Sequence, residues 1–154
     1  MKNRYFPLFV SSFGKEILVI GGGKIAERRI DTLTEFDFQI TVVSPVVTEK
    51  LESLAETGRI VWIMDYYDKK YMNDCFMALA CTCNREVNRS VGLDAKERGI
   101  PVSVCDRKEE CTFYFPAVAA GEEVTAGIVG TGKDHGAVRR AAAKVREIIK
   151  RKAY

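Results

Sequence analysis

Residues 16–26 constrain the fold of this chain more than any other stretch. The apolar run at 17–20 is short, rich in β-branched side chains and followed by glycine, which predicts a strand buried on both faces of a parallel sheet. Gly21, Gly23 and Ala26 then follow the spacing G-x-G-x-x-A. In this motif the first glycine permits a tight turn, the second lets the backbone approach a pyrophosphate, and the small third residue lets a helix pack closely on the strand.

The helix expected after these glycines is a second reason to expect a bound anion. Its free N–H groups and the positive end of its dipole favour a phosphate at this point. The motif also has the strand before it and the helix after it that it requires, so we favour nucleotide binding over a glycine-rich turn without a ligand. The candidate cofactor-binding residues of this turn are Gly21, Gly22, Gly23, Lys24, Ile25 and Ala26.

The composition is that of one ordinary globular domain. The chain has 154 residues, of which 47% are hydrophobic and 10% aromatic, which is enough for a full core. No apolar run is long enough to cross a bilayer, and the basic N-terminus has no hydrophobic signal core behind it. We therefore expect a cytoplasmic protein without a membrane partner.

The charge is too small to indicate nucleic acid. The net charge is +3, but basic residues crowd the end of the chain. A solvated helix face and a basic wall facing a polyanionic ligand explain this crowding equally well. The residues concerned are Arg139, Arg140, Lys144, Arg146, Lys150, Arg151 and Lys152.

The five cysteines are odd in number and lie in or beside apolar, strand-like segments. This pattern predicts buried free thiols rather than a disulfide framework. Cys81 and Cys83, two residues apart on one strand face, have no second cysteine pair or histidine nearby in sequence, so no metal site is expected there. The full set is Cys75, Cys81, Cys83, Cys105 and Cys111.

Strands and helices alternate through the first two thirds of the chain. The pattern predicts an α/β fold of the Rossmann type: a doubly wound parallel sheet with right-handed crossovers and a ligand crevice along the carboxyl ends of its strands. Residues 5–10 are expected to form an extended arm that packs against this sheet. The predicted strands lie at 17–20, 39–44, 60–64, 76–81 and 101–105, with helices after the glycine turn, after Thr48 and after Asn84.

The alternation stops after residue 112. The apolar runs 113–120 and 124–129 flank a short turn and predict a β-hairpin, and a helix is expected from about Asp134. This extension is too small to hold its own core, so it must bury its apolar face on the same unit or on a second copy. We expect residues 1–112 to form the nucleotide-binding domain and residues 113–154 to form a homodimer through the hairpin and helix.

The second predicted strand lacks an expected acid. Nicotinamide-binding folds usually carry an acidic residue about twenty positions after the glycines, where it binds the ribose hydroxyls. Here that strand ends in Ser44 and Pro45, and Ser44 offers only a weaker hydroxyl contact. This leaves open whether an adenine nucleotide is used in a reaction or only sensed.

Seven segments together, in a fixed order, match the pattern of a known family. They are 5–9, 19–26, 41–45, 78–82, 86–88, 102–106 and 113–117. With them the chain resembles the precorrin-2 dehydrogenase family, the dehydrogenase and ferrochelatase module of siroheme synthases. The resemblance implies NAD-dependent oxidation of precorrin-2 to sirohydrochlorin, followed in some members by insertion of ferrous iron to give siroheme. It also implies a dimer built through the hairpin and the last helix.

The resemblance places the catalytic aspartate of the family on Asp106, at the end of the fifth predicted strand. A carboxylate there could accept a substrate proton as hydride leaves, or take protons from pyrrole nitrogens as metal enters. The alternative is an ordinary loop carboxylate that caps residues 108–111. Arg139 and Arg140 can pair with the carboxylates of a tetrapyrrole. Further residues assigned in this way are Ser44, Pro45 and Thr82 for the cofactor and Asn88, Gly132 and Lys133 for the substrate.

Two stretches depart from the family pattern. Cys83 and Asn84 stand where acidic residues are usual, and Asp134 and His135 stand where the last loop usually has serine and proline. His135, the one histidine of the sequence, is a candidate for proton transfer or chelation, although a surface or capping role is more common. Many members also carry a further helical segment. These departures keep open a non-catalytic nucleotide or tetrapyrrole binding module, and a chelatase without dehydrogenase activity.

Overall fold

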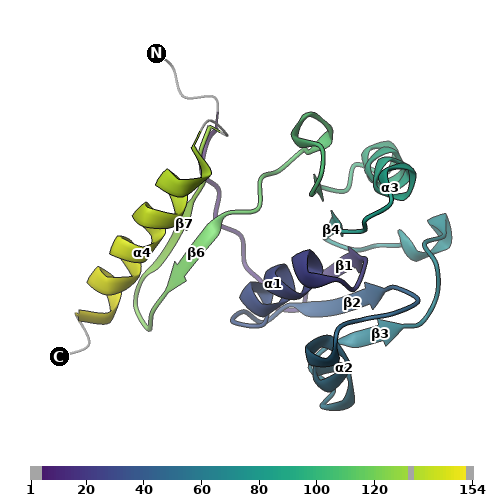
Figure 1. The fold of residues 1–154 in the computed structure, drawn as a ribbon, viewed down its shortest axis with the longest axis horizontal. Coiled ribbons are helices and arrows are strands. Elements are labelled where there is room, and N and C mark those ends of the chain that lie inside the picture. Colours follow the sequence, from purple (N-terminus) through teal and green to yellow (C-terminus); the bar gives the residue numbers. More distant parts are fainter. Residues whose placement is uncertain (1–4, 132–133, 152–154) are drawn as a thin grey trace. The chain divides into compact units, whose positions relative to one another are not determined.

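The computed structural model describes residues 5–131 and 134–151 (Figure 1). The chain divides into two compact units. The sheet unit is Ser11–Phe113, and the hairpin unit combines Met1–Val10 with Tyr114–Tyr154. The described residues of the arm thus group with the hairpin, where the ring of Tyr5 lies 4.5 Å from that of Tyr114. The sequence had predicted that the arm packs against the parallel sheet, whereas in the structure it belongs to the hairpin unit.

The sheet unit contains a five-stranded sheet in which every neighbouring pair is parallel. The strand order β3-β2-β1-β4-β5 confirms the doubly wound, Rossmann-like fold. The central strand is paired on both sides, and its residues Ile17 to Ile20 are at most 1% exposed. The strands are β1 (Glu16–Ile20), β2 (Gln39–Val43), β3 (Val61–Ile63), β4 (Met77–Ala80) and β5 (Val102–Val104).

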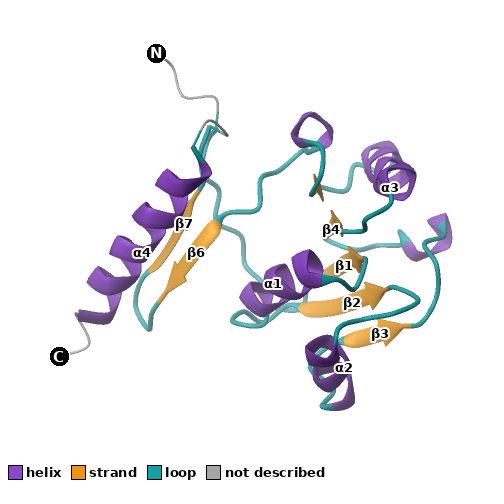
Figure 2. Ribbon diagram, viewed as in Figure 1, coloured by secondary structure: helices purple, strands orange, loops and turns teal. Residues whose placement is uncertain are grey.

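Helices alternate with these strands, as Figure 2 shows by colour. Side-chain caps fix two of the helix starts: Thr48 Oγ1 accepts from the Leu51 N–H at 3.4 Å, and Asn84 Oδ1 accepts from the Glu86 N–H at 3.0 Å. The sequence had predicted that helices begin after both of these residues. The helices are α1 (Lys24–Leu33), α2 (Glu49–Glu56) and α3 (Arg85–Glu97), with short 3₁₀ turns η1 (Lys69–Tyr71) and η2 (Lys108–Glu110).

The parallel register brings the carboxyl ends of the strands to one edge of the sheet. Ladder hydrogen bonds continue one residue past the strands: the Gly21 N–H donates to Val43 O at 3.0 Å, and the Cys81 N–H donates to Ile20 O at 2.8 Å. The loops that follow β1, β2, β4 and β5 therefore leave from the same edge. They carry residues 21–23, Ser44, Pro45, Thr82 and Asp106, whereas the candidates 24–26 and Asn88 lie in the helices α1 and α3.

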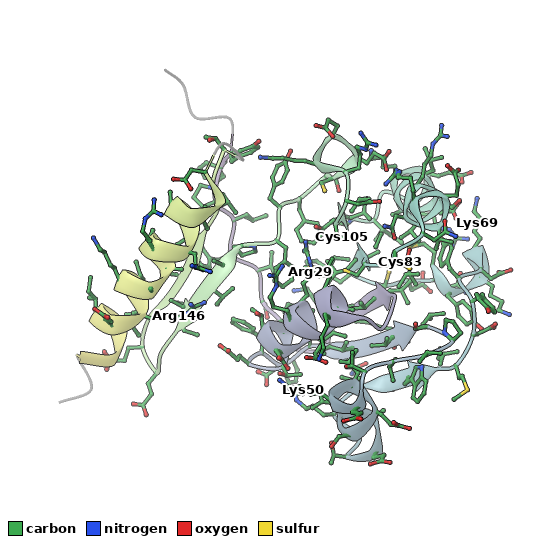
Figure 3. The ribbon with its side chains drawn as sticks, in the orientation of Figure 1. Arg29, Lys50, Lys69, Cys83, Cys105 and Arg146 are labelled. Atoms are coloured by element: carbon green, nitrogen blue, oxygen red, sulfur yellow. The ribbon has the colours of Figure 1, made fainter. Side chains whose placement is uncertain are left out.

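The hairpin unit pairs β6 (Ala117–Ala120) with β7 (Thr125–Ile128) in antiparallel register, and α4 (His135–Arg151) packs against them. Ala119 and Ala142 are each only 1% exposed. The guanidinium of Arg146, labelled in Figure 3, donates two hydrogen bonds to the Val118 carbonyl, at 2.7 and 3.1 Å. One basic side chain of α4 thus binds the hairpin instead of facing solvent alone.

In the described parts of both units, no helix combines the length and the apolar character needed to cross a membrane.

Two isoleucines of α1 provide a test of where the core lies. Ile30 is fully buried, whereas Ile25 is 44% exposed. Ile30→Ala should lower the free energy of unfolding by about 2–5 kcal/mol, because the cavity adds to the lost apolar burial. Ile25→Ala, the same chemical change on the same helix, should stay within about 0.5 kcal/mol. Urea unfolding followed by circular dichroism measures both, and equal losses would contradict this placement of the core.

Candidate functional site

The three glycines after β1 differ in whether the structure requires glycine at their positions. Gly21 has a φ of +109°, and a Cβ on it would lie 2.5 Å from the Cys81 carbonyl oxygen. A Cβ on Gly22 would lie 2.5 Å from the Val46 carbonyl oxygen. Gly23 has a φ of −85°, and a Cβ on it would meet nothing within 4 Å. The first two glycines are therefore required by close backbone packing, and the third lies beside open space.

The open space at Gly23 lies at the start of α1. Gly23 is the N-cap residue and brings no side-chain hydrogen bond to the first turn, so no side chain of its own covers the helix N-terminus. Lys24, next in the chain, is 82% exposed in its side chain and pairs with Glu27 at 3.2 Å. Ile25 is exposed and Ala26 is fully buried against the sheet unit. Such a helix start suits a phosphate group.

The loop after β2 is closed by its own contacts. The Ser44 hydroxyl donates to the Val46 carbonyl at 2.6 Å and is only 7% exposed as a residue. The Trp62 indole N–H donates to the Ser44 carbonyl at 2.9 Å. Ser44 thus shapes the turn through Pro45 toward Gly22. The ribose contact expected from Ser44 would use only the remaining acceptor capacity of its oxygen.

Thr82, after β4, is held by Asn88 of α3. The Thr82 N–H and hydroxyl donate to Asn88 Oδ1 at 3.1 and 2.7 Å, and Asn88 Nδ2 donates to the Thr82 carbonyl at 3.0 Å. Asn88 is fully buried. Its amide therefore positions Thr82 and does not face solvent, which differs from the direct substrate contact expected from the sequence. The sequence signal was its place on the buried face of α3, one helical turn before Val91.

Asp106 lies just past β5 and forms an ion pair with Arg85, the first residue of α3. Arg85 Nη1 donates to Asp106 Oδ1 at 2.7 Å, and Arg85 Nη2 contacts Glu110 Oε2. The three side chains are each about one third exposed (30%, 35% and 28%). The hydrogen bond with Glu110, supported by the charge of Asp106, raises the pKa of the Arg85 guanidinium.

This cluster also decides one alternative left open by the sequence. The N-cap of η2 is Arg107, and no side chain caps that turn. Asp106 is therefore not the cap of residues 108–111. Arg85 and Glu110 had not been identified from the sequence, because each lies more than twenty residues away from one of its partners in the cluster.

The cysteines are free thiols, as predicted, but they differ in exposure. Cys75 and Cys81 are buried, Cys105 and Cys111 are partly buried, and Cys83 is exposed. The prediction that Cys83 is buried was wrong, because it lies past the end of β4, where the alternation of a strand no longer applies. Among the described residues, no group of three or more His, Cys, Asp or Glu side chains could hold a metal ion.

The remaining candidates belong to the hairpin unit. Gly132 and Lys133 lie outside the described residues, and His135 is the first residue of α4. Arg139 is exposed, and Arg140 pairs with Asp134 at 3.1 Å, with both side chains more than half exposed. The Asp134 carboxylate also accepts a hydrogen bond from the Ala137 N–H at 3.0 Å, so it caps the first turn of α4.

The known proteins to which this chain is similar agree with one another. Residues 8–117 match the model of NAD_binding_7, a family described as NAD(P)-binding. The chain is 40% identical over 144 residues, 93% of its length, to the "Probable multifunctional siroheme biosynthesis protein HemA" of Ruminiclostridium josui. It is 32% identical over 144 residues, 94% of its length, to the siroheme synthase of a Psychrobacter species. The resemblance to the siroheme synthase module is thereby confirmed.

These relatives are much longer than this chain, which covers 28% and 30% of their lengths respectively. Among solved structures, the chain is similar to "SirC, precorrin-2 dehydrogenase", with a TM-score of 0.82 and 21% sequence identity. That match covers 94% of this chain and 70% of the other. At this identity the likeness shows a shared fold.

The glycine turn allows a stability test without any ligand. Gly21→Ala should destabilise the protein by at least about 1–3 kcal/mol, since it strains a positive φ and drives a methyl group into the Cys81 carbonyl. Gly23→Ala should cost less than about 1 kcal/mol, because its Cβ enters open space. Thermal unfolding of the two variants beside the wild type is the measurement. A tolerated alanine at position 21 would show that the turn is not packed as described.

Proposed function

This chain belongs to the NAD_binding_7 family of NAD(P)-binding domains, and from this premise we propose that it is an NAD-dependent precorrin-2 dehydrogenase that forms sirohydrochlorin. The observation that carries the proposal is that an open helix start and a carboxylate held by an arginine lie at the same edge of the sheet. The glycine turn and the open start of α1 follow β1, and Asp106, held by Arg85, follows β5. A crevice along this edge suits a dinucleotide and a substrate that exchange hydride.

The residues of the glycine turn fit the pyrophosphate of the cofactor. Gly21 and Gly22 bring the backbone close to neighbouring loops, and Gly23 leaves the helix start uncovered. When bound, NAD would accept the hydride. Residues 44–47, just after β2, contain no basic side chain, and Lys50 is paired with Asp31. A 2′-phosphate usually needs an arginine in this region, which supports NAD over NADP.

Asp106 is the group we assign to proton transfer. Its carboxylate is partly exposed at the strand end and can accept the proton that the substrate loses as hydride departs. Arg85 fixes the direction of that carboxylate through Oδ1, while Glu110 holds the other arm of the guanidinium. Asn88 plays a similar positioning role for Thr82 on the neighbouring loop. The reacting edge is thus oriented by buried or paired polar groups rather than by free side chains.

Binding of the substrate carboxylates is proposed for the basic face of α4. Arg139 is exposed, and among the described residues Arg140 is held by an exposed pair with Asp134, which costs little to exchange for a ligand carboxylate. Lys133 and His135 remain further candidates for this role.

We also propose a homodimer through the hairpin unit, supported by the exposed apolar side chains of Val124 (53%) and Ile148 (60%).

Cofactor binding can be tested at Gly23 separately from folding. Gly23→Asp should leave the fold intact or stabilise α1, because aspartate is a good N-cap and its Cβ meets open space. The same carboxylate should repel the pyrophosphate and raise the Kd for NAD at least about tenfold. Isothermal titration with NAD and with NADP measures this, and Gly23→Ser is the uncharged control. Unchanged NAD affinity in the aspartate variant would contradict a phosphate site at this turn.

Turnover tests the role of Asp106. Purified protein given precorrin-2 and NAD should form sirohydrochlorin and NADH, and Asp106→Asn should lower kcat by about 10²–10⁴-fold because the amide cannot accept the proton. Asp31→Asn, at a surface ion pair on α1, is the control and should keep the wild-type rate.

Three other outcomes of this assay would contradict parts of the proposal. Binding of NAD and tetrapyrrole without NADH formation would identify a binding module. Insertion of ferrous iron into sirohydrochlorin without any NAD-dependent step would identify a chelatase. A full rate in Asp106→Asn would remove the aspartate from the chemistry while leaving the dehydrogenase assignment in place.

A further inference from the structure

Two cysteines lie side by side at the ends of neighbouring strands. β4 and β5 pair in parallel with Ala80 opposite Val104, and the next step of this register sets Cys81 opposite Cys105. The Cys105 N–H still donates to the Ala80 carbonyl at 3.0 Å, so the pairing continues to this point. Adjacent strands lie about 4.8 Å apart, which falls in the range of Cα separations that disulfides span.

The two thiols influence each other's ionisation. The Cys81 thiol donates a hydrogen bond to the Cys105 sulfur, and this bond is the chief cause that lowers the pKa of Cys105 to about 7. The same interaction, together with burial, raises the pKa of Cys81. Cys105 is thus the thiol that ionises, and Cys81 is the one that keeps its proton.

The surroundings of Cys105 add charge of both signs. Arg29 of α1 donates to the Ser103 hydroxyl at 3.2 Å, and residues two apart on β5 share a face, so its guanidinium lies toward Cys105 (Figure 3). Arg29 lowers the pKa of Cys105, while burial and the charge of Asp106 raise it. From α3, the uncharged Asn88 amide lies 3.9 Å from the Cys105 sulfur.

Exposure assigns different roles to the two thiols. Cys105 is partly exposed, so a small reagent can reach it, whereas Cys81 is only 4% exposed and is reached through Cys105. Cys83 is exposed, but it follows Cys81 on the β4 side and has no place in the β5 register. An accessible thiolate with a buried thiol beside it is the arrangement of a reactive and a resolving cysteine.

We propose that Cys81 and Cys105 form a dithiol site that small disulfides, such as oxidised glutathione, convert into an intramolecular disulfide. The Cys105 thiolate attacks one sulfur of the small disulfide, releases one glutathione thiolate and keeps the other glutathione as a mixed disulfide. Cys81 then loses its proton to solvent and attacks the Cys105 sulfur, which releases the second glutathione thiolate. The two electrons lost by the cysteine pair reduce one molecule of the oxidant.

This bond would act on the site through its two loops. The Cys81 carbonyl is the group against which Gly21 packs, and Asp106 directly follows Cys105. Joining the two cysteines would draw the β4 and β5 loops together and change the position of both. Lower turnover in the oxidised state rests on the proposed dehydrogenase function, whereas formation of the disulfide itself does not.

Thiol mapping of the full chain tests the site. After incubation with oxidised glutathione and alkylation, mass spectrometry with peptide fragmentation should show a Cys81–Cys105 link, the loss of two free thiols and no retained glutathione. Dithiothreitol should restore both thiols. Cys81→Ala should instead keep one glutathione on Cys105, and Cys83→Ala, the exposed control, should form the link as the wild type does.

The outcomes that overturn the proposal are distinct. Glutathione retained on wild-type Cys105, a link made through Cys83, or five unchanged thiols would each do so, and all three are read on the wild-type protein even if a variant fails to fold. Failure of the proposed function would appear separately, as absent NAD binding with the disulfide still formed.

The pH dependence tests the role of the hydrogen bond. The rate of Cys105 modification in the wild type should rise as the pH passes through about 7, because the thiolate is the nucleophile. In Cys81→Ala the donor is lost, so the midpoint should move upward, toward the ordinary thiol value of about 8.5, and the rate at neutral pH should fall several-fold. An unchanged midpoint would show that Cys81 does not activate Cys105.

Discussion

The pairing of β1 on both of its sides determines the arrangement of the sheet and of the loops that carry the candidate site. Because β2 and β4 flank it in parallel register, the backbone of this strand has no free edge, and its side chains face the core on both sides. In a parallel sheet each connection crosses back to the edge where the next strand begins. The loops that follow the strands therefore all leave from the same edge, although their residues differ in chemistry. The glycine turn, Thr82 and Asp106 lie at one edge of the sheet for this reason, although 85 positions separate Gly21 from Asp106 in the sequence.

The polar groups at this edge hold one another. Asn88 is fully buried and its amide hydrogen-bonds to Thr82. The guanidinium of Arg85 forms ion pairs with two carboxylates, those of Asp106 and Glu110. Unpaired polar groups at such positions would be costly, so the pairs keep the loops in one arrangement. The loops are thus held by polar side chains that bind one another, whereas the space beside Gly23 is open to a ligand.

Local patterns predicted much of this arrangement. The strands, the order of helices and the caps at Thr48 and Asn84 follow from periodicity and from residue types that act within a few positions of themselves. Other features depend on contacts over long sequence distances. The Arg85 ion pairs and the meeting of Cys81 with Cys105 require the strand order, which the sequence predicted only as a class of fold. The inward direction of Asn88 and the exposure of Cys83 depend on where a helix face or strand ends, within one or two residues.

The sharing of Arg85 between Asp106 and Glu110 has a consequence for the balance of charge. With both carboxylates ionised, the three side chains carry a net charge of one negative unit. If Asp106 takes up a proton, Arg85 and Glu110 remain as a neutral pair, and neither is left alone in a partly buried place. A proton that Asp106 accepted in the proposed reaction would therefore leave no unpaired charge in the cluster, and the guanidinium would keep Glu110 as its partner.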